Sequence, residues 1–218
     1  MSTSQNNAEP PGRMNAREDI LDAAEMAFSE AGFAGASMKA IALRACVAQG
    51  LIHYHFQSKD GLYAAVVERR AIWITTTREA LLDEVDLTRP DAVRHIFEAF
   101  FRPPLGPEGG GTVFARIFAL LAVGDGRDQA LAERLYDPSA RRFIDALATV
   151  RPDASREACA WGYSMALGLL VGAVGRSRRP ERLAGMPERS EDDTEVLIRR
   201  LALHATGGFT ALCEEDPV

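Results

Sequence analysis

The stretch from Ser37 to Lys59, SMKAIALRACVAQGLIHYHFQSK, has the apolar spacing of two short helices that cross at a tight turn. Residues 45–47 are too few to form anything but that turn. Ser37 and Ser58 can each cap the helix that follows, because a serine hydroxyl accepts a hydrogen bond from a first-turn N–H group. The spacing therefore predicts a helix-turn-helix whose buried positions are Ile41, Ala42, Val47, Ile52 and Phe56.

The same stretch lies in the longest acid-free run of the chain, residues 31–59, which carries Lys39, Arg44 and Lys59. A duplex is first gripped through its phosphates, so a docking surface should lack acids even in a protein whose net charge is −6. The charge pattern therefore favours a nucleic-acid face confined to one region. Short apolar helices also cross in many folds, so a hairpin that packs on another part of the protein fits the spacing too.

A longer set of residues between 17 and 67 keeps a fixed order around this stretch: Ala23-Ala24 to Phe28, Gly32-Phe33, Ser37, Ile41-Ala42, Ala45-Cys46-Val47, Gly50, Tyr54-His55-Phe56, and Ser58-Lys59 with Leu62. This order resembles the DNA-binding region of the TetR/AcrR family of bacterial transcriptional regulators, over a whole three-helix unit. Cys46 stands where that family usually has glycine, and His53 where it usually has tyrosine. The cysteine affects the backbone preference of the turn. The histidine affects a phosphate contact, because imidazole is shorter than phenol.

The rest of the chain shows helical patterns and no strand-like alternation of useful length. Residues 15–31 form a first amphipathic pattern that stops at Gly32, and a pattern from Lys59 past Leu81 is long enough to belong to two domains. Pro90 is placed to open the next helix, and RPPLGPEGGG then breaks the pattern. Further helices are expected at 112–124, 126–136, 138–150, 155–175 and 191–213, with a loop at 176–190.

These patterns predict an all-α fold. A disordered N-terminal arm, residues 1–13, precedes a three-helix helix-turn-helix domain at 14–62, and a long helix joins it to an all-helical C-terminal domain at 63–218. The resemblance implies that the first domain binds DNA and that the second binds a ligand and dimerises.

Specific DNA contacts are assigned with the help of the resemblance. Lys59 is expected to hold a phosphate, Tyr54 and His55 to contact the backbone, and Gln49 and Lys39 to reach base edges. Gly50 would allow close backbone approach, and Leu51 would touch a thymine methyl group. The full candidate set is Ser37, Lys39, Ala48, Gln49, Gly50, Leu51, His53, Tyr54, His55 and Lys59.

Residues 158–175 carry no charge, as a membrane span would, but the segment is at the short limit for a span and half of it is Gly, Ala, Ser or Cys. A buried helix that pairs with the last helix across a two-fold axis is the preferred interpretation, and the resemblance implies a four-helix bundle there. The alternative is that both stripes are core of a monomer. The expected interface residues are Ala158, Gly162, Ala166, Gly168, Gly172, Leu197, Leu201, Ala205 and Phe209. A dimer would read a pseudo-palindromic double-stranded operator, because one recognition helix reads too few base pairs.

The C-terminal domain also carries apolar residues that could line a cavity: Phe97, Phe100, Phe101, Phe114, Phe118, Leu121, Trp161 and Met165. Such stripes are more often ordinary core, and the resemblance alone favours a small-molecule effector. The C-terminal run also faintly resembles subgroups of the family that respond to acyl or other hydrophobic metabolites, through Tyr136-Asp137-Pro138, Trp161 and the pair Gly208-Phe209. The function expected from the resemblance is a repressor released from its operator by a small, largely apolar molecule.

An enzyme is the main competing class, and the motifs speak against it. There is no phosphate loop, dinucleotide glycine pattern or serine elbow, and His53 and His55 point to different sides of one helix. Three separated cysteines with no CxxC suggest neither a zinc site nor a disulfide framework, which fits a reducing cytoplasm. No catalytic residue, metal or cofactor is therefore expected. A helical protein-interaction module without specific DNA binding remains the other alternative.

Overall fold

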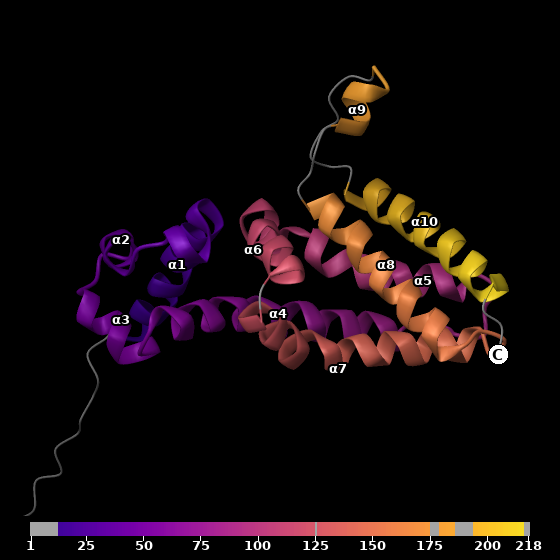
Figure 1. The fold of residues 1–218 in the computed structure, drawn as a ribbon, viewed down its shortest axis with the longest axis horizontal. Coiled ribbons are helices and arrows are strands. Elements are labelled where there is room, and N and C mark those ends of the chain that lie inside the picture. The colour runs from indigo at the N-terminus through magenta and orange to yellow at the C-terminus, as the bar shows by residue number, and fades with distance from the viewer. Residues whose placement is uncertain (1–12, 125, 175–178, 186–193, 216–218) are drawn as a thin grey trace, which may run out of the picture. The chain divides into compact units, whose positions relative to one another are not determined.

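The computed structural model describes residues 13–124, 126–174, 179–185 and 194–215, and this part of the chain is all-α, as the sequence predicted (Figure 1). The predicted arm at 1–13 lies outside the described residues except for its last position. The chain divides into two compact units, an N-terminal unit of residues 1–67 and a C-terminal unit of residues 68–218. Helix α4 (Lys59–Asp83) crosses the boundary between them.

The N-terminal unit contains α1 (Arg13–Gly35), α2 (Met38–Arg44), α3 (Gln49–Phe56) and the start of α4. Gly32, the predicted stop of the first helix, has φ 66° and kinks α1, which resumes for one more turn. The core around α1 is aromatic and aliphatic: the ring of Phe28 meets that of Tyr63 edge-on at 5.1 Å. Ile20, Ile41 and Ile52 are fully buried beside it, which holds α2 and α3 against α1.

The turn between α2 and α3 follows the sequence prediction. The Ser37 hydroxyl accepts a hydrogen bond from the N–H of Ala40 at 3.4 Å, and the Ser58 hydroxyl accepts one from the N–H of Gly61 at 3.0 Å, so both serines cap helices. Cys46 has φ 55°, in the left-handed region where glycine is favoured. The glycine usual at this position therefore matches a backbone requirement that Cys46 meets under strain.

The C-terminal unit contains the other helices of the described residues. Helix α10 packs along α5 and α8, and α7 packs against α5, α6 and α8 (Figure 1). The described elements after α4 are α5 (Ala92–Leu105), the short 3₁₀ helix η1 (Pro107–Gly109), α6 (Gly111–Val123), α7 (Gly126–Val150), α8 (Arg156–Val174), α9 (Arg179–Leu183) and α10 (Thr194–Glu215).

Three predictions for this unit are wrong in detail. Helix α5 begins at Ala92, not at Pro90, and runs through Pro103 and Pro104 before it ends. The two helices expected at 126–136 and 138–150 are one helix, because α7 continues through Pro138. The expected loop at 176–190 contains the five-residue α9. A proline removes a helical N–H donor, but buried side chains on both sides of it keep each helix in place.

No helix in the described part of the chain is both long and apolar enough to cross a membrane. Helix α8, which holds most of the uncharged segment, buries Ala158, Cys159 and Leu170 inside the C-terminal unit.

Candidate functional sites

One face of the N-terminal unit presents the exposed side chains of α2 and α3. Lys39, Gln49, His53 and Tyr54 are exposed there, and 79% of Tyr54 is accessible to solvent. On the opposite side of these helices, Ile41, Ala42, Ile52 and Phe56 are buried, while Val47 is half-buried. The buried side chains hold the short helices in position, so that the exposed ones are presented from a rigid support. We call Lys39, Gln49, Gly50, His53 and Tyr54 the α2–α3 face.

The start of α3 is open to an incoming group. Ala48 occupies the N-cap and makes no side-chain hydrogen bond, so no side chain caps the first-turn N–H groups. A Cβ atom built on Gly50 would meet nothing within 4 Å. Packing inside the protein therefore does not require glycine at this exposed position, and its absence of a side chain leaves the backbone approachable.

The remaining residues predicted to contact DNA differ in solvent exposure and in the hydrogen bonds that they already make. Leu51 and His55 are half-buried, and the Ser37 hydroxyl already caps α2. The Nδ1 atom of His53 lies 3.2 Å from the carbonyl oxygen of Gln57. His53 thus contacts the end of its own helix, but its exposed ring remains on the α2–α3 face.

Lys59 has a structural role within the N-terminal unit. Its Nζ atom donates to the carbonyl oxygen of Ala34 at 3.1 Å and lies 4.9 Å from the centre of the Phe33 ring. These contacts hold the segment after the kink of α1 against the start of α4. The ammonium group of Lys59 has to leave these partners, or share them, to hold a phosphate.

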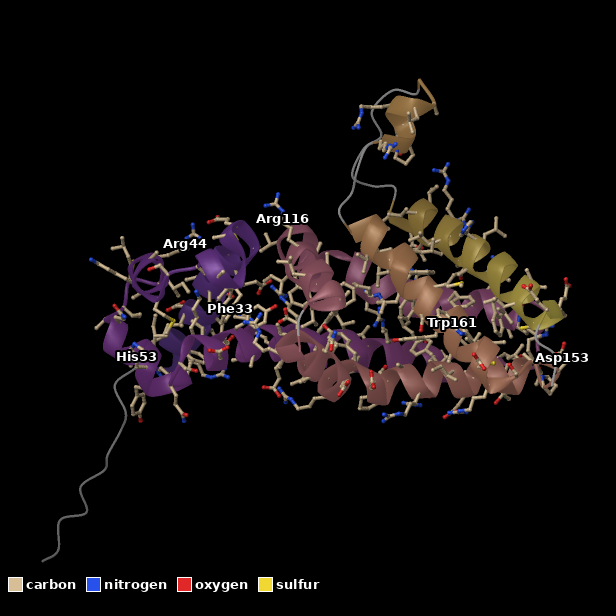
Figure 2. All side chains as sticks on the ribbon, in the orientation of Figure 1. Phe33, Arg44, His53, Arg116, Asp153 and Trp161 are labelled. Atoms are coloured by element: carbon tan, nitrogen blue, oxygen red, sulfur yellow. The ribbon has the colours of Figure 1, made fainter. Side chains whose placement is uncertain are left out.

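A residue of this region that was absent from the predicted site is Leu43, whose side chain is 81% exposed. Leu43 is out of the helical register of the buried residues Ile41 and Ala42, and this spacing could have predicted its exposure. Arg44, by contrast, pairs with Glu30 at 3.0 Å, so its charge is neutralised (Figure 2). Leu43 borders a shallow groove lined by Ser37, Lys39, Ala40, Ala42, Leu43, Val47 and Gln49.

The predicted ligand residues of the C-terminal unit fall into two groups. Trp161 and Met165 are 53% and 52% exposed, so their assignment to an interior cavity is wrong. Trp161 and Met165 lie three residues after Ala158 and Gly162, respectively, on one edge of the same helical stripe, so spacing alone did not separate the exposed part of this stripe from the buried part. The other predicted residues are buried: Phe97, Phe100, Phe101, Phe114, Phe118 and Leu121.

The predicted dimer residues are also divided. Ala158, Gly162, Ala166, Ala205 and Phe209 are buried inside the single chain, so this part of the prediction is wrong. A Cβ atom on Gly162 would lie 2.6 Å from Cδ2 of Phe209, which shows that these small residues bring α8 and α10 of one chain together.

The other four predicted dimer residues are accessible to different extents. Gly168 and Gly172 are exposed, and Leu197 and Leu201 are half-buried. The exposed glycines share the outer side of α8 with Trp161 and Met165, and Leu203 of α10 is 65% exposed. We call Trp161, Met165, Gly168, Gly172 and Leu203 the outer α8–α10 face.

A buried arginine of the C-terminal unit was missed entirely. Arg78 is only 1% exposed, its guanidinium lies 4.0 Å from the centre of the Phe100 ring, and its Nε donates to the Phe100 carbonyl oxygen at 2.9 Å. Its Nη2 atom is buried without a hydrogen-bond partner. The signal was present in the sequence, because residues 71, 74, 78 and 82 form one helical stripe and all four are buried.

Burial lowers the pKa of the Arg78 guanidinium, and the nearby hydroxyl groups of Tyr163 and Tyr136 partly oppose that effect. The group stays charged, because an arginine pKa starts far above neutrality. Burial raises the pKa of Tyr163, so its phenol is neutral at pH 7 and supplies no negative charge.

No three His, Cys, Asp or Glu side chains of the described residues gather into a group that could hold a metal ion. Cys46, Cys159 and Cys213 are free thiols, and burial raises the pKa of the last two.

Comparison with known proteins identifies both units. Residues 20–66 match the family model "Bacterial regulatory proteins, tetR family", and residues 94–208, more than half of the chain, match "Tetracyclin repressor-like, C-terminal domain". The regulator BetI of Burkholderia cenocepacia (strain HI2424) is 32% identical over 72 residues, which is 32% of this chain and 37% of that relative's length.

Solved structures show the same fold at low identity. A TetR-like transcriptional regulator from Rhodococcus sp. RHA1 superposes with a TM-score of 0.58 at 21% identity, over 92% of this chain and 100% of that one. The fatty acid degradation regulator FadR from Bacillus halodurans gives 0.65 at 16% identity, over 88% of this chain and 98% of that one.

Proposed function

Since this chain belongs to the TetR family of bacterial regulatory proteins, we propose that it is a homodimeric transcriptional regulator that binds a pseudo-palindromic operator and is released from it by a small molecule. Repression is the mode of action we propose, and the cytoplasm, where bacterial DNA lies, is the place where it would act. The matched models are regulator domains, and we propose no catalytic activity. The family match does not favour a protein-interaction module without DNA binding.

The observation that carries the proposal is the α2–α3 face. It places a cation, an amide and a phenol on the exposed side of two short helices, within a run of 29 residues that contains no Asp or Glu (31–59). Such groups suit the two kinds of contact that operator binding needs, because cations and N–H groups hold phosphates and amides pair with base edges.

Within this face we propose distinct roles. Gln49, at the first position of α3, would read a base edge, and Lys39 would reach a guanine or a neighbouring phosphate. Tyr54, with 79% of its surface exposed, would contact the DNA backbone, as would His53 and His55. Gly50 and the uncapped N-terminus of α3 would allow a phosphate or base edge to approach the main chain.

Dimerisation follows from the need for two half-sites, since one eight-residue recognition helix covers too few base pairs for a specific site. We propose the outer α8–α10 face as the surface that pairs with its copy. It presents a tryptophan, a methionine and a leucine to solvent, beside two glycines that let another helix come close.

The direct test is selection of binding duplexes from a random pool by the purified full-length protein, followed by binding of the enriched duplex across a salt series. We expect a palindromic sequence and a steep fall of affinity with salt. The Lys39→Ala variant should flatten the salt dependence by about one phosphate contact. The Gln49→Ala variant should relax the sequence preference at one position of each half-site.

Arg141→Ala is the matched control, because Arg141 is an exposed arginine of α7, in the C-terminal unit, and pairs with Asp137. Its operator affinity and salt dependence should equal those of the wild type. Enrichment of no sequence, or equal loss of affinity for all sequences in Gln49→Ala, would contradict the proposed reading of bases by α3.

A further inference from the structure

Among the described residues of the C-terminal unit, the arginine Arg78 is buried without a negatively charged partner. Arg78 is 1% exposed, and among the described residues no Asp or Glu forms an ion pair with it. An uncompensated buried charge is costly, whereas a buried charge that meets an opposite charge and hydrogen bonds is tolerated. A ligand that supplies the negative charge would therefore bind favourably here, because the folded protein has already met the cost of burying the arginine.

Arg78 has an internal role that uses only part of its guanidinium. Helix α5 contains Pro104, which has no N–H group for the carbonyl oxygen of Phe100, four residues earlier. The Nε atom of Arg78 supplies that hydrogen bond at 2.9 Å. The guanidinium also lies over the face of the Phe100 ring, which attracts a cation, but its Nη2 atom is left without a hydrogen-bond partner and its charge without an anionic partner among the described residues.

Side chains of α7 and α8 gather at the Phe100 ring, over which the Arg78 guanidinium lies. The Tyr163 ring of α8 and the Phe143 ring of α7 both contact the Phe100 ring, at 5.1 and 5.8 Å between centres, while the guanidinium lies over that ring. The buried hydroxyl of Ser139 has no hydrogen-bond partner and lies one turn before Phe143 on the same face of α7. Arg78, Ser139, Phe100 and Tyr163 form what we call the Arg78 cluster.

We propose that the Arg78 cluster is the recognition site for the carboxylate of the effector, and that the effector is an apolar organic acid rather than a neutral hydrophobic molecule. This inference rests on the proposed function, because it names the chemistry of the effector in the same domain. The Nη2 group of Arg78 would donate to the carboxylate, and the hydroxyls of Ser139 and Tyr163 would donate further hydrogen bonds.

The charge of the cluster selects the head group. One guanidinium balances one carboxylate, whereas a phosphate monoester, with nearly two negative charges at neutral pH, would leave a net buried charge. The aromatic side chains beside the cluster favour an apolar body: the Phe118 ring of α6 meets the Tyr136 ring at 5.8 Å and continues towards Phe114.

Burial also gives the site a way to signal. Because Arg78 is almost inaccessible to solvent, a ligand reaches it only when the surrounding helices or side chains move. The ligand would then bind the opened arrangement better than the closed one, which is the condition for shifting an equilibrium between two states.

The test compares matched probes on the full-length protein: octanoate and phenylacetate as carboxylates, octan-1-ol as the neutral analogue, octylamine as the cation and octyl phosphate as the dianion. Affinities are measured by calorimetry and ligand-induced shifts of the melting temperature. We expect a carboxylate to bind and to raise the melting temperature, and the alcohol, amine and phosphate to bind more weakly. Arg78→Gln, which keeps an N–H donor for Phe100, should weaken the carboxylate by about ten- to a hundredfold.

Two further variants keep the test decisive. Arg78→Lys retains the charge and should retain part of the affinity, and Ser139→Ala should weaken the carboxylate with little effect on the alcohol. Arg116→Gln, an exposed arginine of α6, is the control and should bind like the wild type (Figure 2). The inference is overturned if neither carboxylate binds better than octan-1-ol, if octyl phosphate binds best, or if Arg78→Gln binds the carboxylate unchanged.

Operator binding is measured in parallel without ligand for the wild type and for Arg116→Gln, and the two should bind the operator equally. A wild-type protein that binds carboxylate through Arg78 but selects no DNA sequence would contradict the proposed function alone. A protein that binds its operator but ignores every carboxylate would contradict only the present inference.

Discussion

The Nε atom of Arg78 donates a hydrogen bond of 2.9 Å to the carbonyl oxygen of Phe100, the acceptor that Pro104 leaves without a helical donor. This contact satisfies the acceptor that Pro104 leaves free, and α5 continues to Leu105. A side chain 22 residues before Phe100 in the chain thus replaces the N–H group that Pro104 lacks.

The coupling between Arg78 and Pro104 is measurable by a double-mutant cycle. Arg78→Met removes the donor to Phe100, whereas Pro104→Ala restores a backbone N–H that can replace it. We expect Arg78→Met to be less destabilising in the Pro104→Ala background by about 1 kcal/mol, measured by urea unfolding. Pro138→Ala serves as the control partner and should combine additively with Arg78→Met. Additivity with Pro104→Ala as well would show that the two residues do not share the acceptor.

The left-handed backbone of Cys46 predicts a stabilising substitution. Its φ of 55° strains any residue with a Cβ atom, so Cys46→Gly should raise the free energy of unfolding of the N-terminal unit by about 0.5 to 1 kcal/mol. Cys46→Ala keeps the Cβ atom and should give no such gain. Hydrogen exchange of α2 and α3 amides would locate the change, and slower exchange in Cys46→Ala than in Cys46→Gly would refute the explanation.

Lys39 and Lys59 should behave differently when each is replaced by methionine. Lys39 is exposed, so its loss should weaken operator binding and leave stability unchanged. Lys59 binds Ala34 and lies over Phe33, so its loss should also lower the stability of the N-terminal unit by about 1 kcal/mol. Circular dichroism melts, read beside a salt series of operator binding, separate the two effects. Equal melting of both variants would show that the Lys59 contacts add nothing to stability.

Gly162 is expected to tolerate no side chain. An added Cβ atom would lie 2.6 Å from the Phe209 ring, which is 1% exposed and cannot move freely. Gly162→Ala should therefore destabilise the C-terminal unit by about 1 to 3 kcal/mol in urea unfolding. Gly208→Ala is the matched control, because a Cβ there meets nothing within 4 Å, and it should not lower stability. If Gly162→Ala left the free energy of unfolding unchanged, α8 and α10 could move apart at that point without cost.

The outer α8–α10 face predicts where the dimer is most easily broken. Trp161→Glu should weaken the dimer by about 2 kcal/mol or more, because exposed tryptophans are frequent interface anchors. The dimer dissociation constant is measured by sedimentation equilibrium. Leu183→Glu places the same charge at another exposed apolar residue, on α9, and should leave the dimer intact. A Trp161→Glu protein that dimerises like the wild type would move the interface elsewhere.

Local signals were sufficient for the helix-turn-helix. Ile41, Ile52 and Phe56 were predicted to be buried from spacing alone, and each is at most 6% exposed. Ser37 and Ser58 were predicted as caps, and both accept the expected hydrogen bonds. These features depend on neighbours within a few residues along the chain, which is why the sequence pattern contains them.

The prolines of the C-terminal unit show where local signals failed. Proline is a reliable helix breaker only if nothing else satisfies the groups that it leaves free. At Pro104 the distant Arg78 does so, and at Pro138 the helix is held by buried Tyr136 and Phe143 on either side. Neither compensation is visible in the residues next to the proline.

The sequence by itself determined the helical periods, and with them which residues of α8 share a side; it did not determine which side is inside the chain. Gly162 and Gly168 both suit close helix packing, but only Gly162 lies against Phe209, whereas Gly168 is exposed beside Trp161. Likewise, the spacing of residues 71, 74, 78 and 82 places them on one helix face, but it did not predict that the arginine among them is buried. Tertiary packing decided both, because the free energy of burying a side chain depends on which distant atoms it meets.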